Sequence, residues 1–64
     1  MRDIPAGDLV PGDLVYSSRT QQLMLILSSN TREGGVEISW LPLVDGKSIM
    51  IATVKNSQVF TEVR

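Results

Sequence analysis

The chain has 64 residues, which predicts one small domain that buries only about 60% of the surface its unfolded form exposes. It contains no cysteine and no histidine. Disulfides, cysteine nucleophiles and histidine-activated serines are therefore excluded, and a structural zinc site lacks its usual ligands. Six Lys and Arg against seven Asp and Glu give a net charge of −1, which argues against affinity built on phosphate contacts. We expect self-association or a partner protein to supplement the small core.

Neither a leader nor a membrane span is expected from the distribution of apolar residues. Residues 1–7 hold two charges and no apolar stretch of signal-peptide length. The longest apolar run, residues 23–27, is far shorter than the ~20 residues that cross a bilayer. We therefore expect a cytoplasmic protein that does not associate with membranes.

The first half of the chain predicts an arm, a turn and two strands. Residues 1–11 form a short extended arm, and Pro11-Gly12 suits a type II turn because its third position needs a positive φ. The first strand is expected over residues 13–17. The second, residues 22–29, has apolar side chains on both faces, which indicates that both faces are covered.

A polar loop over residues 30–35, expected to be the least rigid part of the chain, leads into the third strand. That strand, residues 36–41, alternates strictly, with Val36, Ile38 and Trp40 on one face and polar residues on the other. This period of two is typical of a strand with one buried and one solvated face.

The last part of the chain predicts a hairpin and a final strand. Asp45-Gly46 is a strong hairpin signal because both residues tolerate positive φ. It places the fourth strand over residues 47–54. A tight connection at residues 55–57 then leads to a last strand over residues 59–63.

The chain thus combines the start Pro11-Gly12-Asp13-Leu14-Val15 with a tryptophan-containing strand, an Asp-Gly turn and the closing pair Glu62-Val63. This combination resembles very short phage-encoded proteins with an SH3-like fold, and the resemblance covers nearly the whole chain. It implies an all-β protein, a five-stranded SH3-like β-barrel over residues 1–64, located in the host cytoplasm or in the virion.

The acidic and basic side chains predict no catalytic, cofactor-binding or metal-binding site. Asp8 and Asp13 each follow a glycine and precede a Leu-Val pair, where a carboxylate accepts hydrogen bonds from turn N–H groups. Lys47 and Lys55 flank turns, and a solvated lysine lacks the lowered pKa that catalysis needs. We expect no enzyme, no metal and no cofactor.

The surplus of apolar side chains predicts a protein interface. A small barrel accepts about one face of each strand in its interior. The residues expected to fill it are Val15, Leu23, Leu25, Leu27, Val36, Ile38, Trp40, Ile49, Ile51, Val59 and Val63. The apolar side chains left outside would form the kind of patch that marks an interface, which we predict from Met24, Ile26, Met50, Ala52 and Leu43. The alternative is that residues 4–10 of the arm cover them.

Three residues are candidates for contact with a ligand: Trp40, Arg32 and Tyr16. Arg32 lies in the expected polar loop, and the other two are aromatic. Because Trp40 shares the apolar face of an alternating strand, its main place is expected to be the core.

These features predict a non-enzymatic protein–protein interaction module that forms a homo-oligomer, and the resemblance implies that it is a phage protein. It would act as a virion or assembly component, or as an inhibitor that binds a host protein. Two alternatives stay open. One is a nucleic-acid-binding small barrel, whose affinity would fall steeply with salt. The other is an oligomer that sequesters a small anionic ligand with an arginine of its polar loop.

Overall fold

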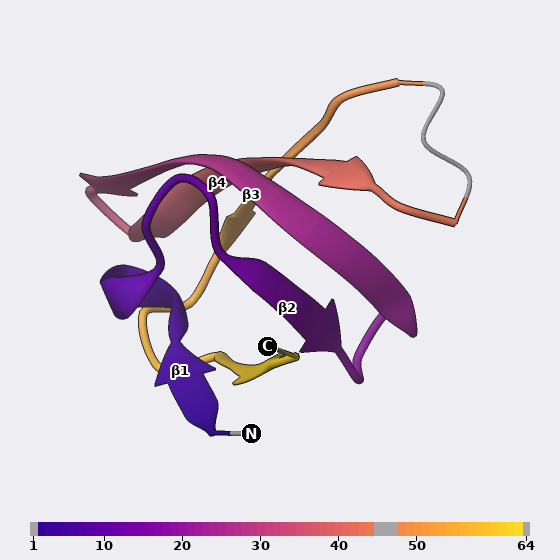
Figure 1. The fold of residues 1–64 in the computed structure, drawn as a ribbon. Helices are drawn as coiled ribbons and strands as arrows, with labels where there is room; N and C mark the ends of the chain where they lie inside the picture. The colour runs from indigo at the N-terminus through magenta and orange to yellow at the C-terminus, as the bar shows by residue number, and fades with distance from the viewer. Residues whose placement is uncertain (1, 45–47, 64) are drawn as a thin grey trace.

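The computed structural model describes residues 2–44 and 48–63, and within them the chain forms one antiparallel six-stranded sheet and one short 3₁₀ helix (Figure 1). The elements in chain order are β1 (Asp3–Pro5), η1 (Ala6–Asp8), β2 (Leu14–Ser17), β3 (Gln22–Arg32), β4 (Gly35–Pro42), β5 (Met50–Val54) and β6 (Val59–Glu62). The all-β prediction is confirmed. The sixth strand arises because part of the N-terminal arm forms β1.

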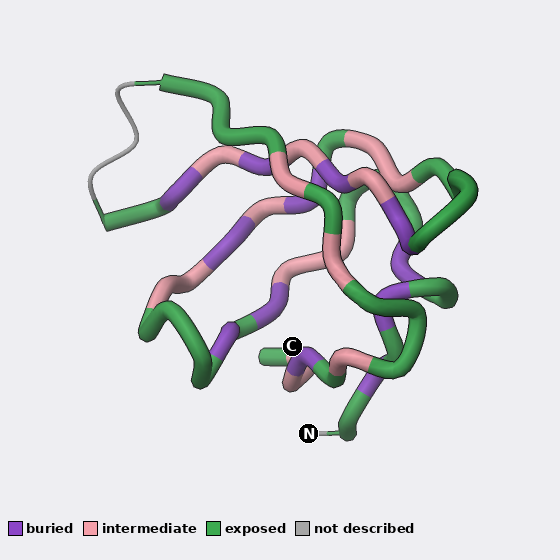
Figure 2. The backbone as a smooth tube through the Cα atoms, turned by 180° about the vertical axis from the view of Figure 1, so that it is seen from behind, coloured by how far each residue is buried: buried purple, intermediate pink, exposed green. Residues whose placement is uncertain are grey.

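The strands follow the order β1-β6-β2-β3-β4-β5 in the sheet. Strands β2 to β5 are neighbours in chain order, whereas β6 returns to lie between β1 and β2. There Phe60 of β6 faces Ile4 of β1, and Glu62 faces Val15 of β2. The sheet curls around one interior (Figure 2) but does not close, since among the described strands β5 pairs only with β4 and β1 only with β6.

The turns that the sequence predicts are present where the structure describes them. The amide of Asp13 donates to the carbonyl of Val10 at 3.1 Å, and Gly12 has a φ of +95°, as the third position of a type II turn requires. The Asp13 carboxylate accepts from the amide of Val10 at 2.9 Å, which confirms its turn role. The Asp45-Gly46 hairpin lies outside the described residues.

The expected loop over residues 30–35 is mostly strand. Its residues continue the β3–β4 ladder until Arg32 pairs with Gly35, which leaves only Glu33 and Gly34 in the turn. Gly34 adopts a φ of +92°, which a glycine reaches without steric cost. Polar side chains here belong to a solvated strand end, and polarity alone does not separate such an end from a loop.

The core combines one face of the sheet with the N-terminal arm. Its buried apolar residues are Ile4, Ala6, Leu9, Val15, Met24, Ile26, Val36, Ile38, Trp40 and Phe60. The prediction that Val15, Val36, Ile38 and Trp40 are core residues is confirmed. The arm itself is held by a hydrogen bond of 2.8 Å from the amide of Ala6 to the carbonyl of Gln58. It therefore covers the interior and not the outside of the sheet.

For β3 and β5 the predicted inward face is wrong. Ile26 of β3 pairs with the inward Trp40, so β3 turns Met24 and Ile26 inward and Leu23 and Leu25 outward. In β5 the inward position opposite Ile38 holds Ala52. The expected core residues that are exposed instead are Leu27, Ile49, Ile51, Val59 and Val63. Because both faces of these segments are apolar, alternation alone could not decide which face points inward.

A β-bulge fixes the inward face along the whole of β3. Ile26 pairs with Trp40 but Ser28 pairs with Ser39, so Leu27 is an extra residue on β3. A bulge bends its strand and increases the local twist. After it, the Ser28 and Ser39 hydroxyls lie 2.6 Å apart, and Ser29 donates to the carbonyl of Ala6 at 3.5 Å.

Gly35→Ala should destabilise the fold. A Cβ at Gly35 would overlap the backbone carbonyl oxygen of Val54, and the φ of +154° is one that residues with a side chain rarely adopt. We expect the free energy of unfolding in urea to fall by about 1–3 kcal/mol. Gly7→Ala is the matched control, because a Cβ there meets nothing within 4 Å. Equal stability of the two variants would contradict the close approach of β4 and β5.

Two identical substitutions test the inward face of β3 and the outward face of β5. Ile26 is 0% exposed and Ile51 is 67% exposed. Ile26→Ala should cost about 2–5 kcal/mol in the free energy of unfolding, because it leaves a cavity in the core. Ile51→Ala should cost less than about 1 kcal/mol, which reflects strand propensity. Denaturant melts of dilute protein measure both, and the reverse ranking would show that the strands face the other way.

Candidate functional site

The convex side of the sheet carries a row of apolar side chains that crosses strands β2, β3 and β4. Leu25 of β3 pairs with Leu14 of β2 on one side and with Leu41 of β4 on the other. Val63 continues the row, since its amide donates to the carbonyl of Leu14 at 3.0 Å. Aligned side chains of this kind contact one another directly across strands. The row is therefore a continuous apolar band on the outside of the sheet.

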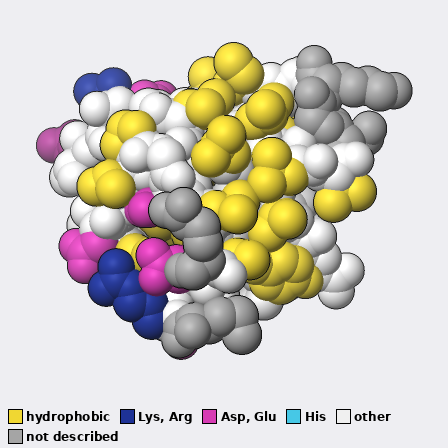
Figure 3. All heavy atoms as spheres, in the orientation of Figure 1, with side chains coloured by type: hydrophobic (Ala, Val, Ile, Leu, Met, Phe, Trp, Pro, Cys, Tyr) yellow, Lys and Arg dark blue, Asp and Glu magenta, His cyan; other side chains and the backbone are white. Residues whose placement is uncertain are grey.

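A second row runs beside the first. Tyr16 pairs with Leu23, and the amide of Leu43 donates to the carbonyl of Leu23 at 3.0 Å. We call the two rows and their exposed neighbours the outer face: Leu14, Tyr16, Leu23, Leu25, Leu27, Leu41, Leu43, Ile51 and Val63. All of them are half-buried or exposed. Figure 3 shows apolar side chains gathered over β3 and its neighbours.

The structure divides the five predicted interface residues. Met24 is 2% exposed and Ile26 is 0% exposed, so both belong to the core and the prediction that they lie outside it is wrong. The physical reason is the pairing of Ile26 with the inward Trp40. Ala52 is also turned inward, where it packs against the core opposite Ile38.

Met50 and Leu43 are each 42% exposed. Leu43 belongs to the outer face. Met50 faces Trp40 at the start of the edge strand β5, so it lies on the inner side of the sheet at its border. Of the predicted interface residues, only Leu43 therefore lies on the outer face. Whether either residue contacts a partner stays a prediction.

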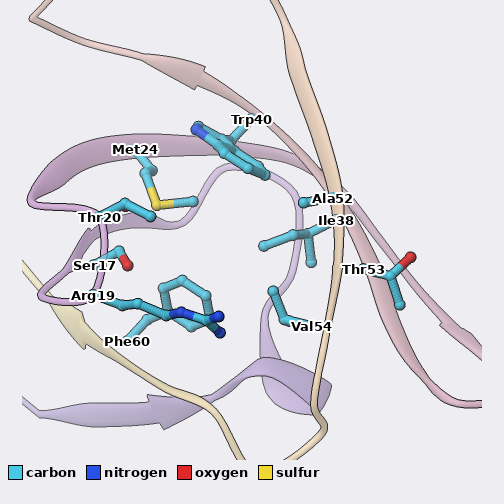
Figure 4. Close-up of a pocket in the computed structure, with 10 residues that line it drawn as sticks. All are labelled: Ser17, Arg19, Thr20, Met24, Ile38, Trp40, Ala52, Thr53, Val54 and Phe60. Carbon is cyan, nitrogen blue, oxygen red and sulfur yellow. The ribbon is translucent and has the colours of Figure 1, made fainter.

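A pocket of about 230 Å³ opens on the inner side of the sheet, between β5 and the turn that joins β2 to β3. Its lining residues are Ser17, Arg19, Thr20, Met24, Ile38, Trp40, Ala52, Thr53, Val54 and Phe60. Figure 4 shows Trp40 and Phe60 on opposite sides of the space, with Ala52 and Val54 between them along β5. The pocket lies where the curled sheet fails to close.

Hydrogen bonds position two of the lining side chains. Arg19 Nη1 donates to Gln58 Oε1 at 3.2 Å, which ties the β2–β3 turn to the segment before β6. Trp40 Nε1 donates to Gln22 Oε1 at 3.3 Å, so its polar atom is satisfied and its ring supplies apolar wall.

The three predicted ligand-contact residues are not brought together. Trp40 is buried and lines the pocket. Tyr16 lies on the outer face, on the other side of the sheet. Arg32 sits at the end of the β3–β4 hairpin, where its Nη2 lies 3.1 Å from Glu37 Oε1. The arginine that lines the pocket is Arg19. Its position in the sequence, two residues after Ser17 at the end of β2, is the feature from which it could have been predicted.

The remaining charges form no basic surface among the described residues that could follow a phosphate backbone. Arg2 Nε lies 3.1 Å from Glu62 Oε1, and Arg32 is paired with Glu37. Both pairs are exposed and contribute little to stability. Residues 2–44 and 48–63 contain no group of three acidic side chains that could hold a metal ion, and no helix in the same ranges is long and apolar enough to cross a bilayer.

Comparison with known proteins assigns no function to the chain, so a functional assignment rests on the geometry alone. No family model, no curated protein and no solved structure matches the chain.

Proposed function

We propose that the protein is a non-enzymatic protein-binding domain that self-associates through its outer face. The observation that carries the proposal is the pair of apolar rows on β2, β3 and β4, which no described element covers. Contiguous exposed apolar patches are rare on monomeric proteins and mark interaction sites.

The size of the protein supports an interface of this kind. A standard interface buries about 800 Å² on each partner. That area is about a fifth of the 4294 Å² that is accessible on the isolated chain. A 64-residue domain has a small core, so burial of a second apolar face adds stability that the interior alone cannot supply.

The chemistry of the outer face favours a second copy of the chain as the partner. The rows consist of leucines, one valine and one tyrosine, and the charged pair Arg32–Glu37 lies beyond them at the hairpin end. A neutral apolar face is self-complementary, as a two-fold interface requires. Two such sheets pack face to face at about 10 Å, with their side chains interdigitated.

The fold that fits this proposal is an SH3-like barrel with an open seam. The pairing of β6 with β2 supports this fold, because it bends the five strands β2 to β6 toward a closed sheet. Membership among short phage-encoded proteins, in the virion or directed at a host protein, stays a prediction from the sequence. The pairing of Arg2 and Arg32 with carboxylates weighs against the nucleic-acid alternative.

Leu25→Lys should dissociate the proposed dimer and leave the domain folded. Leu25 is half-buried on the outer face, where a lysine keeps its ammonium in water in the monomer. Across the interface two such charges would face each other without water, so we expect self-association to weaken at least about tenfold. Sedimentation over a range of protein concentrations measures association, and circular dichroism measures folding.

Asn56→Lys is the charge-matched control, because Asn56 is an exposed turn residue away from the apolar rows. It should associate as the wild type does. A wild type that stays monomeric at millimolar concentration, or a folded Leu25→Lys that associates unchanged, would refute self-association through this face.

A further inference from the structure

The geometry points to the pocket between β5 and the β2–β3 turn as a binding site for a small aromatic carboxylate. This site goes beyond the proposed function, since it lies on the inner side of the sheet and shares no lining residue with the outer face. The ligand class follows from the volume, the charge and the polar contacts of the pocket.

The apolar part of the pocket fits one aromatic ring. An apolar cavity of about 150 Å³ is enough to bind benzene, and this pocket has about 230 Å³. Trp40 and Phe60 lie on opposite sides of it (Figure 4), and although both side chains are mostly buried, the part of each ring that faces the pocket can contact a third ring edge-on. The extra volume leaves room for a short side arm on the ligand.

The charge of the pocket selects an anion. Among its described lining residues Arg19 carries the formal charge, and the lining includes no carboxylate. The bond from Nη1 to Gln58 uses one of the five N–H donors of the guanidinium and holds it beside the opening. A planar guanidinium binds a carboxylate through two parallel hydrogen bonds, which places the anionic arm at the mouth and the ring inside.

Ser17 supplies a polar contact on the same side of the pocket as Arg19 (Figure 4). Its side chain is on the inner face of β2, the residue is only 2% exposed, and its hydroxyl points into the pocket (Figure 4). A hydroxyl on the wall that also holds Arg19 can donate to an oxygen of the ligand arm. The site therefore offers an apolar slot with a hydroxyl donor on one wall and a cation at the opening.

Phenylacetate is the probe, titrated into the wild-type chain of 64 residues and followed by ¹H–¹⁵N correlation spectra. We expect saturable shifts concentrated at residues 17–20, residues 52–54 and the Trp40 indole. For a ligand of this size in a shallow site the dissociation constant should be on the order of 1 mM. Phenylacetamide, which has the same shape but no charge, should bind about threefold or more weaker, a modest factor because Arg19 is exposed.

Three variants assign the binding to this pocket. Arg19→Gln should abolish the preference for phenylacetate over phenylacetamide. Arg32→Gln makes the same chemical change outside the pocket and should leave both affinities unaltered. Ala52→Leu should fill the space and weaken both ligands at least about tenfold. If Ala52→Leu does not fold, the comparison of the two arginine variants decides alone.

Several results would overturn this assignment. One is chemical-shift changes that fail to saturate at tens of millimolar phenylacetate. Another is equal affinity of the wild type for phenylacetate and phenylacetamide. A third is an equal effect of Arg19→Gln and Arg32→Gln on these affinities. A fourth is phenylacetate binding that weakens as the protein concentration rises, because the pocket would then hold a second copy of the chain. Dissociation by Leu25→Lys with phenylacetate binding retained separates this site from the outer face.

Discussion

The register shift at Leu27 decides which side chains of the two longest strands reach the interior. Before it, Ile26 faces Trp40 inside the sheet, and after it Ser29 faces Ile38. A regular ladder would carry Ser28 inward and turn Ser29 toward solvent, which would break the contact of Ser29 with the arm at Ala6. The bulge thus keeps an 11-residue strand in phase with its partner while the sheet bends over the core.

The outer face follows directly from which side chains of β3 point inward. Once Met24 and Ile26 fill the interior, Leu23 and Leu25 must project from the opposite side of β3, because successive side chains alternate. Leu25 pairs with Leu14 of β2 and Leu41 of β4, and Leu23 pairs with Tyr16 of β2. A large part of the apolar surplus of the sequence therefore collects in one band on the convex side of the sheet.

Prediction from sequence succeeded where polar residues mark one face of a strand. In β4 the polar Glu37 and Ser39 alternate with Ile38 and Trp40, and the inward face was predicted correctly. Turn chemistry was equally informative, as Gly12 and the Asp13 carboxylate show. These are local properties, and the residues that determine them are close together in the chain.

The inward faces of β3 and β5 could not be predicted in this way. Both faces of β3 are apolar, so its phase depends on the register with β4, which is set by contacts distant in sequence and shifted by a bulge. In β5 the larger Ile51 was expected inside, but the register with β4 places the smaller Ala52 opposite Ile38. The prediction that Met24 and Ile26 lie outside the core was wrong for the same reason.

Because the sheet is open, a molecule bound in the inner pocket would contact both of its halves, which a molecule on the outer face would not do. Among the described strands, β5 and β6 are joined by chain but not by a ladder, and the two halves of the sheet are held together by the pairing of β2 with β3. The pocket lies across that gap, between Phe60 of β6 and Val54 of β5. A molecule bound there contacts both halves and would stabilise only the folded arrangement that brings them together. A partner on the outer face contacts mainly strands that already pair with one another. It buries apolar surface there but does not connect β5 to β6.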